Sequence, residues 1–430
     1  MIERIREKLS TAARWFDVIE EGGTGTSISF KNSRIHSVTE RQNSGYGIRV
    51  NVGRQTGFSY TNDRARIDET IARAIAASEY GDVEEFDLPA KADVPFEPYD
   101  GSIRSFSISS EIAGAENAIG AVLEKFPAAN IGCSIGESRG SMRIVNSNGI
   151  DQSYKSSHYA ASLSARLILS DGAILDIWES VSACAPRSFE SLAPAIIDKL
   201  EKAREVKKLT SGSVPVVLSP KAFSSIIDIV LAGLNAKSVF KGISPFGDKI
   251  RSAVFAPELT ISDDPGVTGS PYSYPFDDEG VNAGKKFLVN RGRIEQFITD
   301  LKYAHKLNLV PGGNGRRGFS SLPYPSYSNI IIDGGSEPYQ ALLKQIKRGI
   351  MVDQFIGLGQ SNTLTGDFSA GLDLAYLIEN GEIAGRVKDC MLSDNLFTLL
   401  AGTVVFSSEQ EQVGSVLAPY LFLPRVTFTG

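Results

Sequence analysis

The chain has 430 residues, more than one hydrophobic core usually holds, so two domains are expected. Hydrophobic residues make up 42% and charged residues 22%, as in an ordinary soluble globular protein, and no apolar run reaches the roughly 18 residues of a membrane span. The net charge is −6, with 44 basic and 50 acidic residues, which argues against a nucleic-acid partner held by a basic face.

The N-terminal segment MIERIREKLSTAARWF places Ile2, Ile5, Leu9 and Trp15 at helical spacing. It therefore predicts a first helix. The segment lacks the apolar core of a signal peptide, so we expect a cytoplasmic location. The chain's three cysteines are far apart and odd in number, which predicts neither a disulfide framework nor a CxxC pair.

Residues 1 to about 210 predict alternating short strands and amphipathic helices, an α+β arrangement. Strands are predicted at 26–32, 34–40, 45–60 and within 142–169, and helices at Ile67–Ser78, Ile108–Phe126 and Ser191–Val206.

The segment KKLTSGSVPVVLSP, with Gly212 and Pro215, is the predicted domain boundary, giving domains 1–210 and 211–430. A clear helix follows, with Ser219 as N-cap, Pro220 in the first helical position and an end near Asn235.

The remainder predicts strands and loops, interrupted by one helix at Pro338–Lys347, so we expect a curled or barrel-like sheet. The predicted strand segments are 254–266, 284–300, 325–335, 349–359, 372–389 and 418–430.

The segment LIENGEIAGRV, residues 377–387, predicts a hairpin, because Asn380 and Gly381 both tolerate the positive φ of a type I′ turn. This register sets Glu379 directly opposite Glu382, a like-charge pair that costs a few tenths of a kcal/mol.

Familiar catalytic signatures are missing from the sequence. The three histidines, His36, His158 and His305, lie far apart, and no GxSxG, Walker or local Cys-His motif occurs. We interpret the histidines as hydrogen-bonded or surface residues.

Two kinds of segment remain open. The glycine-rich stretch VPGGNGRRGFSS, residues 310–321, could present Arg316 and Arg317 to a carboxylate or peptide carbonyl, or could be a solvated loop. The acidic pairs at Asp263–Asp264 and Asp277–Glu279 could bind a hard cation, or could be ordinary acidic turns.

Taken together, these stretches resemble the TldD/PmbA proteins, PmbA also being called TldE. The resemblance covers nearly the whole chain, and its specificity lies in the ordered set rather than in any single motif. In the first half it rests on 45–75 and on SNGIDQSYKSSHYAASLSA. In the second half it rests on ELTISDDPG, FDDEGV, KKFLVNRGRIEQFITD, GGNGRRG, LTGDFSAG, IENGEIAGRV, SDNL and VGSVLAP.

The resemblance implies a two-domain subunit of a cytoplasmic metallopeptidase. TldD members carry HExxxH on a helix early in the second domain and a Cys near the C-terminus, and they pair with a PmbA-type subunit that lacks the motif. The matching helix here, residues 220–240, has no histidine and a single carboxylate, Asp228. The family's C-terminal CGS reads Val413-Gly414-Ser415, so both departures indicate the PmbA type.

The leading hypothesis is a non-catalytic PmbA/TldE-like subunit that forms a heterodimer with a TldD-like metallopeptidase and encloses a chamber for unfolded or small peptides. It predicts no cofactor in this chain, with zinc in the partner, and no nucleic acid or membrane, although the family also carries the label of DNA gyrase modulator. One alternative is a homodimeric peptide-binding or regulatory module. Another is a stand-alone peptidase with an oxygen-liganded metal held by carboxylates such as Asp228, Asp277, Asp278 or Asp367.

For peptide contacts, the glycine-rich loop supplies the candidates Asn314, Arg316 and Arg317, although GNGRR is closer to the TldD form of that loop. The resemblance also places the IENGEI hairpin near the chamber and the partner subunit, where a basic neighbour would offset Glu379 and Glu382.

Overall fold

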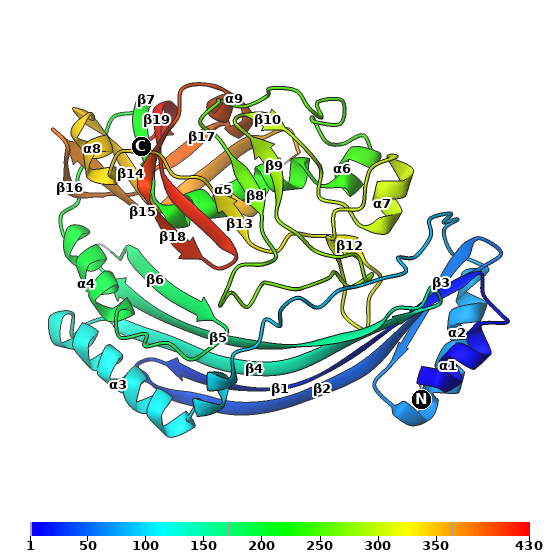
Figure 1. Ribbon diagram of the computed structural model, residues 1–430. Helices are drawn as coiled ribbons and strands as arrows, with labels where there is room; N and C mark the ends of the chain where they lie inside the picture. The colour runs from blue at the N-terminus through cyan, green and yellow to red at the C-terminus, as the bar shows by residue number, and fades with distance from the viewer. Residues whose placement is uncertain (1, 170–171, 361, 363) are drawn as a thin grey trace.

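The computed structural model describes residues 2–169, 172–360, 362 and 364–430. Two separate sheets organise these residues, one strongly curved and one partly closed into a barrel (Figure 1). None of the described helices combines the length and the apolar content that a membrane span requires.

The first sheet has the strand order β3-β2-β1-β4-β5-β6, and every neighbouring pair is antiparallel. Its strands are β1 Trp15–Lys31, β2 Arg34–Val52, β3 Gln55–Thr61, β4 Asn130–Asn146, β5 Asp151–Ile168 and β6 Ile174–Ala183. Helices α3 and α4 cover one face at the left of Figure 1, and α1 and α2 lie at the other end. These helices span α1 Ile2–Leu9, α2 Ile67–Ser78, α3 Ile108–Lys125 and α4 Leu192–Lys202, with short 3₁₀ turns at Arg64–Arg66 and Gly101–Ser105.

The second sheet closes on itself, because β19 pairs with β17 and also with β7. The closed ring comprises β7 Gly212–Leu218, β14 Arg348–Ile356, β15 Asp367–Glu379, β17 Met391–Asn395 and β19 Val416–Thr429. The fold class is therefore confirmed, a mixed α/β chain with a barrel in its C-terminal half.

Further strands extend this barrel. They are β8 Ile261–Asp263, β9 Lys286–Asn290, β10 Arg293–Ile294, β13 Ile330–Ile332, β16 Glu382–Val387 and β18 Val405–Val413, while β11 Gly315–Arg316 and β12 Tyr324–Pro325 form a separate pair. The helices are α5 Pro220–Gly233, α6 Ala236–Phe240, α7 Leu301–Lys306, α8 Tyr339–Lys344 and α9 Leu396–Ala401, with a 3₁₀ turn at Leu358–Gln360.

Helix α5 is the central helix of the C-terminal core. Phe223, Ile227 and Val230 are fully buried among barrel side chains. The predicted cap is confirmed: Ser219 has extended backbone angles, and its hydroxyl accepts a hydrogen bond from the Ala222 N–H.

Several predictions were wrong in extent. The first helix ends at Leu9, and Trp15 instead begins β1, opposite Asn51. The short strand expected at 26–32 is the end of a 17-residue strand, because the glycine-rich stretch before it is also extended. The C-terminal half contains α6, α7 and α9 as well, each too short to show helical periodicity.

The hairpin prediction is confirmed. Asn380 and Gly381 have φ of 50° and 85°, and Glu379 lies opposite Glu382. The basic neighbour is in the same chain, since Arg348 Nε lies 3.8 Å from Glu379 Oε1. The two-domain division at 210/211 remains a prediction, although the last strand of the first sheet ends at Ala183 and the barrel begins at Gly212.

We expect Ser219→Ala to lower the free energy of unfolding by about 1 kcal/mol, because the Ala222 N–H loses its capping acceptor. Urea unfolding monitored by circular dichroism measures the change. Ser225→Ala is the matched control on the same helix, since the Ser225 hydroxyl bonds the Lys221 carbonyl one turn back and caps no helix end. Equal losses in the two variants would contradict the capping role.

Candidate functional site

A cavity of about 940 Å³ lies between the concave face of the first sheet and the loops of the C-terminal half. Residues 21–27 of β1 and 136–142 of β4 form its floor, and residues 271–274 and 324–328 contribute its wall. Ser415, from the turn between β18 and β19, also lines it. The cavity brings polar and aromatic side chains from both halves of the chain to one concave space and is therefore the candidate site.

Glycines allow strands β1 and β4 to pair closely in the floor of this cavity. A Cβ at Gly23 would lie 2.8 Å from the Arg139 carbonyl oxygen, and one at Gly25 would lie 2.9 Å from that of Glu137. Larger residues would push β1 away from β4, so the curved floor needs glycine at these two positions.

Arg316 presents a pre-positioned guanidinium at the cavity. Its Nε lies 3.2 Å from Asp278 Oδ2, and its guanidinium carbon lies 4.2 Å from the centre of the Tyr274 ring. The side chain is 32% exposed, and its buried Nη1 has no hydrogen-bond partner among the described residues, so the fork keeps a donor for a ligand. Five tyrosines line the same space: Tyr154, Tyr272, Tyr274, Tyr324 and Tyr327.

The other two predicted peptide contacts are placed differently. Asn314 is fully buried and donates to Asp263 Oδ2 over 2.6 Å. Arg317 is also buried and donates to Asp17 Oδ1 over 2.9 Å. Neither residue lines the cavity, so within the described structure both side chains bind the chain's own carboxylates, and Arg316 alone of the three faces the candidate site.

Arg317 belongs to a buried charge network that joins the two halves of the chain. Arg49 Nη1 donates to Glu279 Oε1 over 2.8 Å, and the Arg49 guanidinium also forms an ion pair with Asp17. The Asp17 carboxylate forms a second ion pair, with Arg317. Burial opposes ionisation of Asp17, but the two guanidinium groups outweigh it and hold the pKa of Asp17 below its usual value. The sequence offered no signal for this network, because its members are up to 300 residues apart.

Three neighbouring carboxyls in this region titrate unusually. Burial and the charge of Glu279 raise the pKa of Asp277 to about 8 and that of Asp300 to about 7, and burial raises the pKa of Glu279 as well. Both oxygens of Asp277 accept backbone N–H groups, among them that of Gly315 over 2.8 Å. The acidic turn therefore shapes the loop that carries Arg316.

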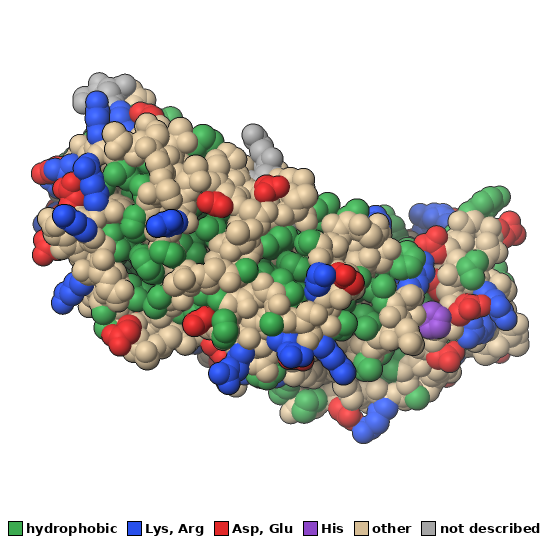
Figure 2. All heavy atoms as spheres, turned by 90° about the horizontal axis from the view of Figure 1, so that it is seen from above, with side chains coloured by type: hydrophobic (Ala, Val, Ile, Leu, Met, Phe, Trp, Pro, Cys, Tyr) green, Lys and Arg blue, Asp and Glu red, His purple; other side chains and the backbone are tan. Residues whose placement is uncertain are grey.

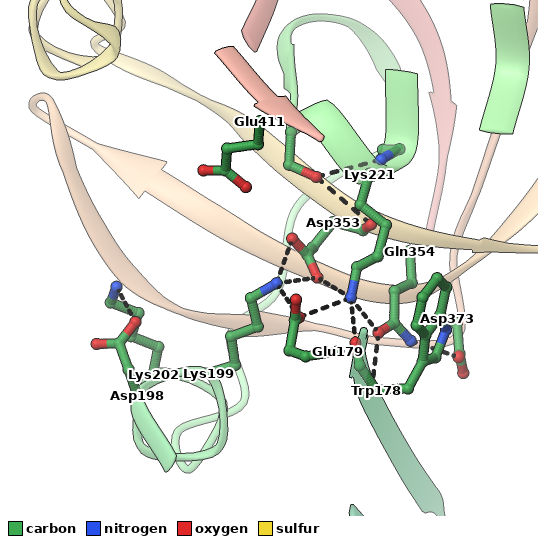
Figure 3. A network of polar contacts seen from close by, with 12 residues as sticks. Trp178, Glu179, Asp198, Lys199, Lys202, Lys221, Asp353, Gln354, Asp373 and Glu411 are labelled. Carbon is green, nitrogen blue, oxygen red and sulfur yellow. Dashed lines mark hydrogen bonds and ion pairs between the residues drawn. The ribbon is translucent and has the colours of Figure 1, made fainter. Parts of the chain in front are cut away.

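A second network joins the halves at β6, the edge strand of the first sheet (Figure 3). Lys199 Nζ lies 2.6 Å from Glu179 Oε1 and 2.8 Å from Asp353 Oδ2. Lys221, in the first turn of α5, contacts the same two carboxylates and lies 4.5 Å from the Trp178 ring centre. These contacts fix the start of α5 against β6 and α4.

The remaining histidines and cysteines offer little for catalysis. His158 lines the cavity and packs against Tyr272, while burial lowers its pKa. All three cysteines are buried as free thiols.

Seen from above, acidic and basic side chains are interspersed rather than gathered by sign (Figure 2), so this face offers no broad basic surface for nucleic acid.

Comparison with known protein families identifies the family of this chain. Residues 211–430, more than half of the chain, match the PmbA/TldA metallopeptidase C-terminal domain, and residues 16–78 match domain 1 of the same proteins. The chain belongs to the PmbA/TldD family.

Relatives from this family span nearly the whole chain. A metalloprotease PmbA homolog of Haemophilus influenzae is 26% identical, covering 95% of this chain and 90% of its own. A metalloprotease of Methanothermobacter thermautotrophicus is 28% identical, covering 87% and 84%. The crystal structure of TldE from Thermococcus kodakarensis has the same fold, with a TM-score of 0.91 over 100% of both chains at 20% identity.

The donor set of this PmbA/TldD member does not fit a zinc ion, which needs about three protein ligands. Helix α5 offers Asp228, which is exposed and accepts the Tyr327 hydroxyl over 2.9 Å, and it has neither histidine nor cysteine. The C-terminal turn Val413-Gly414-Ser415 likewise contains neither histidine nor cysteine. Within the described residues, no three His, Cys, Asp or Glu side chains converge on a point that could hold a metal.

The other acidic residues of the stand-alone alternative also have partners of their own. Asp278 accepts the Arg317 N–H over 2.7 Å, and Asp367 is bound by Thr365 and Asn395 on the barrel. We therefore derive no catalytic step through a metal in this chain.

We expect Arg317→Met to lower the free energy of unfolding by about 3–5 kcal/mol, because Asp17 loses a partner inside the buried network. Urea denaturation measures it. Arg316→Met is the matched variant and should lose less, because the Arg316 side chain is 32% exposed. Equal losses would contradict the buried role assigned to Arg317.

We expect Asp300→Asn to flatten the dependence of stability on pH. The folded pKa of Asp300, about 7, lies above the ordinary 3.8, so its contribution is fully present below about pH 4 and is lost as pH rises through about 7. Asparagine keeps an oxygen for the Tyr303 N–H and cannot ionise. Between pH 5 and pH 8 the wild type should lose on the order of 2 kcal/mol more than the variant in urea titrations. Parallel pH profiles would refute the assignment.

Proposed function

We propose that this chain is a non-catalytic, PmbA/TldE-like subunit that works with a TldD-like metallopeptidase partner in the degradation or processing of unfolded or small peptides. The observation that carries the proposal is the chemistry of α5 and of the turn Val413–Ser415, which lack a zinc donor set beside a large cavity. The partner would supply the zinc, which activates a water molecule for hydrolysis.

The cavity has the chemistry to bind a peptide. Arg316 offers N–H donors to a backbone carbonyl or a terminal carboxylate, and its stacking on Tyr274 limits the side-chain entropy lost on binding. The surrounding tyrosines combine apolar area with hydroxyl groups, a composition suited to peptides of varied sequence.

Helix α5 contacts the wall of this cavity, because the hydroxyl of the lining residue Tyr327 donates a hydrogen bond to Asp228. Ser415 lines the cavity as well. In TldD-type chains, the helix that matches α5 and the turn that matches Val413–Ser415 are expected to carry the metal ligands. In this chain both places adjoin the cavity in which we place the peptide.

The deciding experiment compares the chain alone with the chain co-expressed with its TldD-type partner. Zinc by mass spectrometry, mass in solution and cleavage of an unfolded peptide are measured for both. The proposal expects zinc and cleavage only with the partner. Chelator-sensitive cleavage by the chain alone would overturn it in favour of a stand-alone peptidase, with Asp228→Asn and Asp367→Asn as the first variants. If this chain forms a dimer that binds peptide and does not associate with the partner, the homodimeric module would be favoured.

We expect Arg316→Ala to weaken peptide binding about tenfold or more, because a charge-assisted hydrogen bond to the peptide is lost. Fluorescence anisotropy of a labelled unfolded peptide on the assembled pair measures this, and zinc content should not change. Arg291→Ala, an exposed arginine outside the cavity, is the control. Unchanged affinity in Arg316→Ala would remove Arg316 from the site.

A further inference from the structure

A groove of about 430 Å³ lies where the barrel strands β14 and β19 end, next to the start of β6. Strands β15, β16 and β17 also contribute to its lining. Among the described residues, none lines both this groove and the cavity in which we place the peptide. The groove is therefore a second concave site, separate from that cavity.

Arg386, on β16, is a buried lining residue of this groove that has no ion-pair partner in the described part of the chain. Only 4% of the residue is exposed, and neither its Nε nor its Nη1 has a hydrogen-bond partner there. Its Nη2 donates a long hydrogen bond, 3.4 Å, to the carbonyl oxygen of Asp373. Burial lowers the pKa of Arg386, although Asp373 and Asp389 oppose this shift.

The backbone holds Arg386 in this position. Its N–H donates to the Glu205 carbonyl over 2.7 Å, and its carbonyl accepts the Lys207 N–H over 2.7 Å. The strand therefore does not move easily to release the side chain to water. A buried guanidinium without its hydrogen bonds is costly, and an anion in the groove would recover that cost.

Negative groups in the groove decide which class of anion fits. Asp373 and Asp389 both line it, so a plain carboxylate would come close to two like-charged groups. Asp373 adjoins Arg386, since it supplies the carbonyl that Nη2 reaches. Gln354 fixes the Asp373 carboxyl group by donating to Oδ2 over 3.1 Å (Figure 3). A positive and a negative subsite thus lie side by side, which suits a ligand with both charges on one carbon.

The rest of the groove is suited to an aliphatic side chain. Ile174, Ile356 and Met391 line it and are exposed. A Cβ at Gly371 would lie 2.8 Å from Ile356 Cγ2, so glycine at this position makes room for the Ile356 side chain. A ligand that covered these side chains would remove apolar area from water.

We propose that this groove binds an aliphatic α-amino acid. Arg386 receives its carboxylate, and Asp373 receives its ammonium group. Ile174, Ile356 and Met391 contact its side chain. The inference goes beyond the proposed peptide-binding function and does not depend on it, because the groove and the cavity have no described lining residue in common.

Calorimetric titration of the full chain at pH 7 with L-leucine tests the proposal. Three further probes each lack one element of leucine: 4-methylpentanoate has no ammonium group, 3-methylbutylamine has no carboxylate, and glycine has no side chain. Each should bind at least about tenfold more weakly than leucine, because one contact is lost. Leucyl-leucine should also bind more weakly, because a peptide bond separates its charged ends.

Two variants assign the subsites. Asp373→Asn keeps an oxygen for Gln354 and should weaken leucine binding about tenfold, without weakening the binding of 4-methylpentanoate. Arg386→Met should abolish leucine binding and should unfold at a urea concentration no lower than the wild type, because the chain loses an unpaired buried charge. Arg425→Gln, at an exposed position outside the groove, is the control and should bind leucine normally.

The outcomes that would overturn the proposal are distinct. They are no binding of leucine by the wild type, equal affinity for leucine and 4-methylpentanoate, or tighter binding of leucyl-leucine. Lower stability of Arg386→Met with unchanged leucine binding would make Arg386 a packing residue and would overturn it as well. If Arg386→Met fails to fold, Asp373→Asn decides, since equal losses for leucine and 4-methylpentanoate in that variant would refute the ammonium subsite.

Discussion

The structure depends on arginine and carboxyl side chains that pair with one another in a buried cluster where the two halves of the chain meet. Asp17 and Arg49 come from the first sheet, and Glu279 and Arg317 come from the C-terminal loops. Such pairs add little net stability, because desolvation offsets their attraction, but separating them would leave unpaired charges at a cost of several kcal/mol. The network therefore favours one relative placement of the halves.

That placement defines the cavity. Arg316 and Arg317 are neighbours in the chain, yet one faces the cavity and the other is locked onto Asp17. The buried arginine holds the loop from which the partly exposed arginine reaches a ligand. At β6, the edge strand of the sheet, the lysines Lys199 and Lys221 share Glu179 and Asp353 and secure α5 in the same way. These two attachments hold the C-terminal half against the first sheet and so position the walls of the cavity.

Helix α5 combines a packing role in the barrel with a contact to the cavity. Its apolar residues fill the barrel core, which is a packing requirement that does not depend on catalysis. Its exposed side carries Ser225 and Asp228, of which Asp228 serves Tyr327 at the cavity. The same helix thus supports the peptide-binding surface that we propose.

The sequence by itself determined the features that depend on neighbouring residues. The cap at Ser219, the bounds of α2 and the turn at Asn380–Gly381 follow from local hydrogen bonding, periodicity and φ preference. The ordered motifs indicated the family and the missing zinc ligands, since residue identity alone decides whether a donor is present. Tertiary structure alone decided the length of β1. Its glycines are unfavourable for a strand when the sequence is considered alone. In the folded chain they are required, because a Cβ at Gly23 would lie only 2.8 Å from the Arg139 carbonyl oxygen of the neighbouring strand. It also decided the different fates of Arg316 and Arg317, because their partners come from distant parts of the chain and pair only when the halves dock.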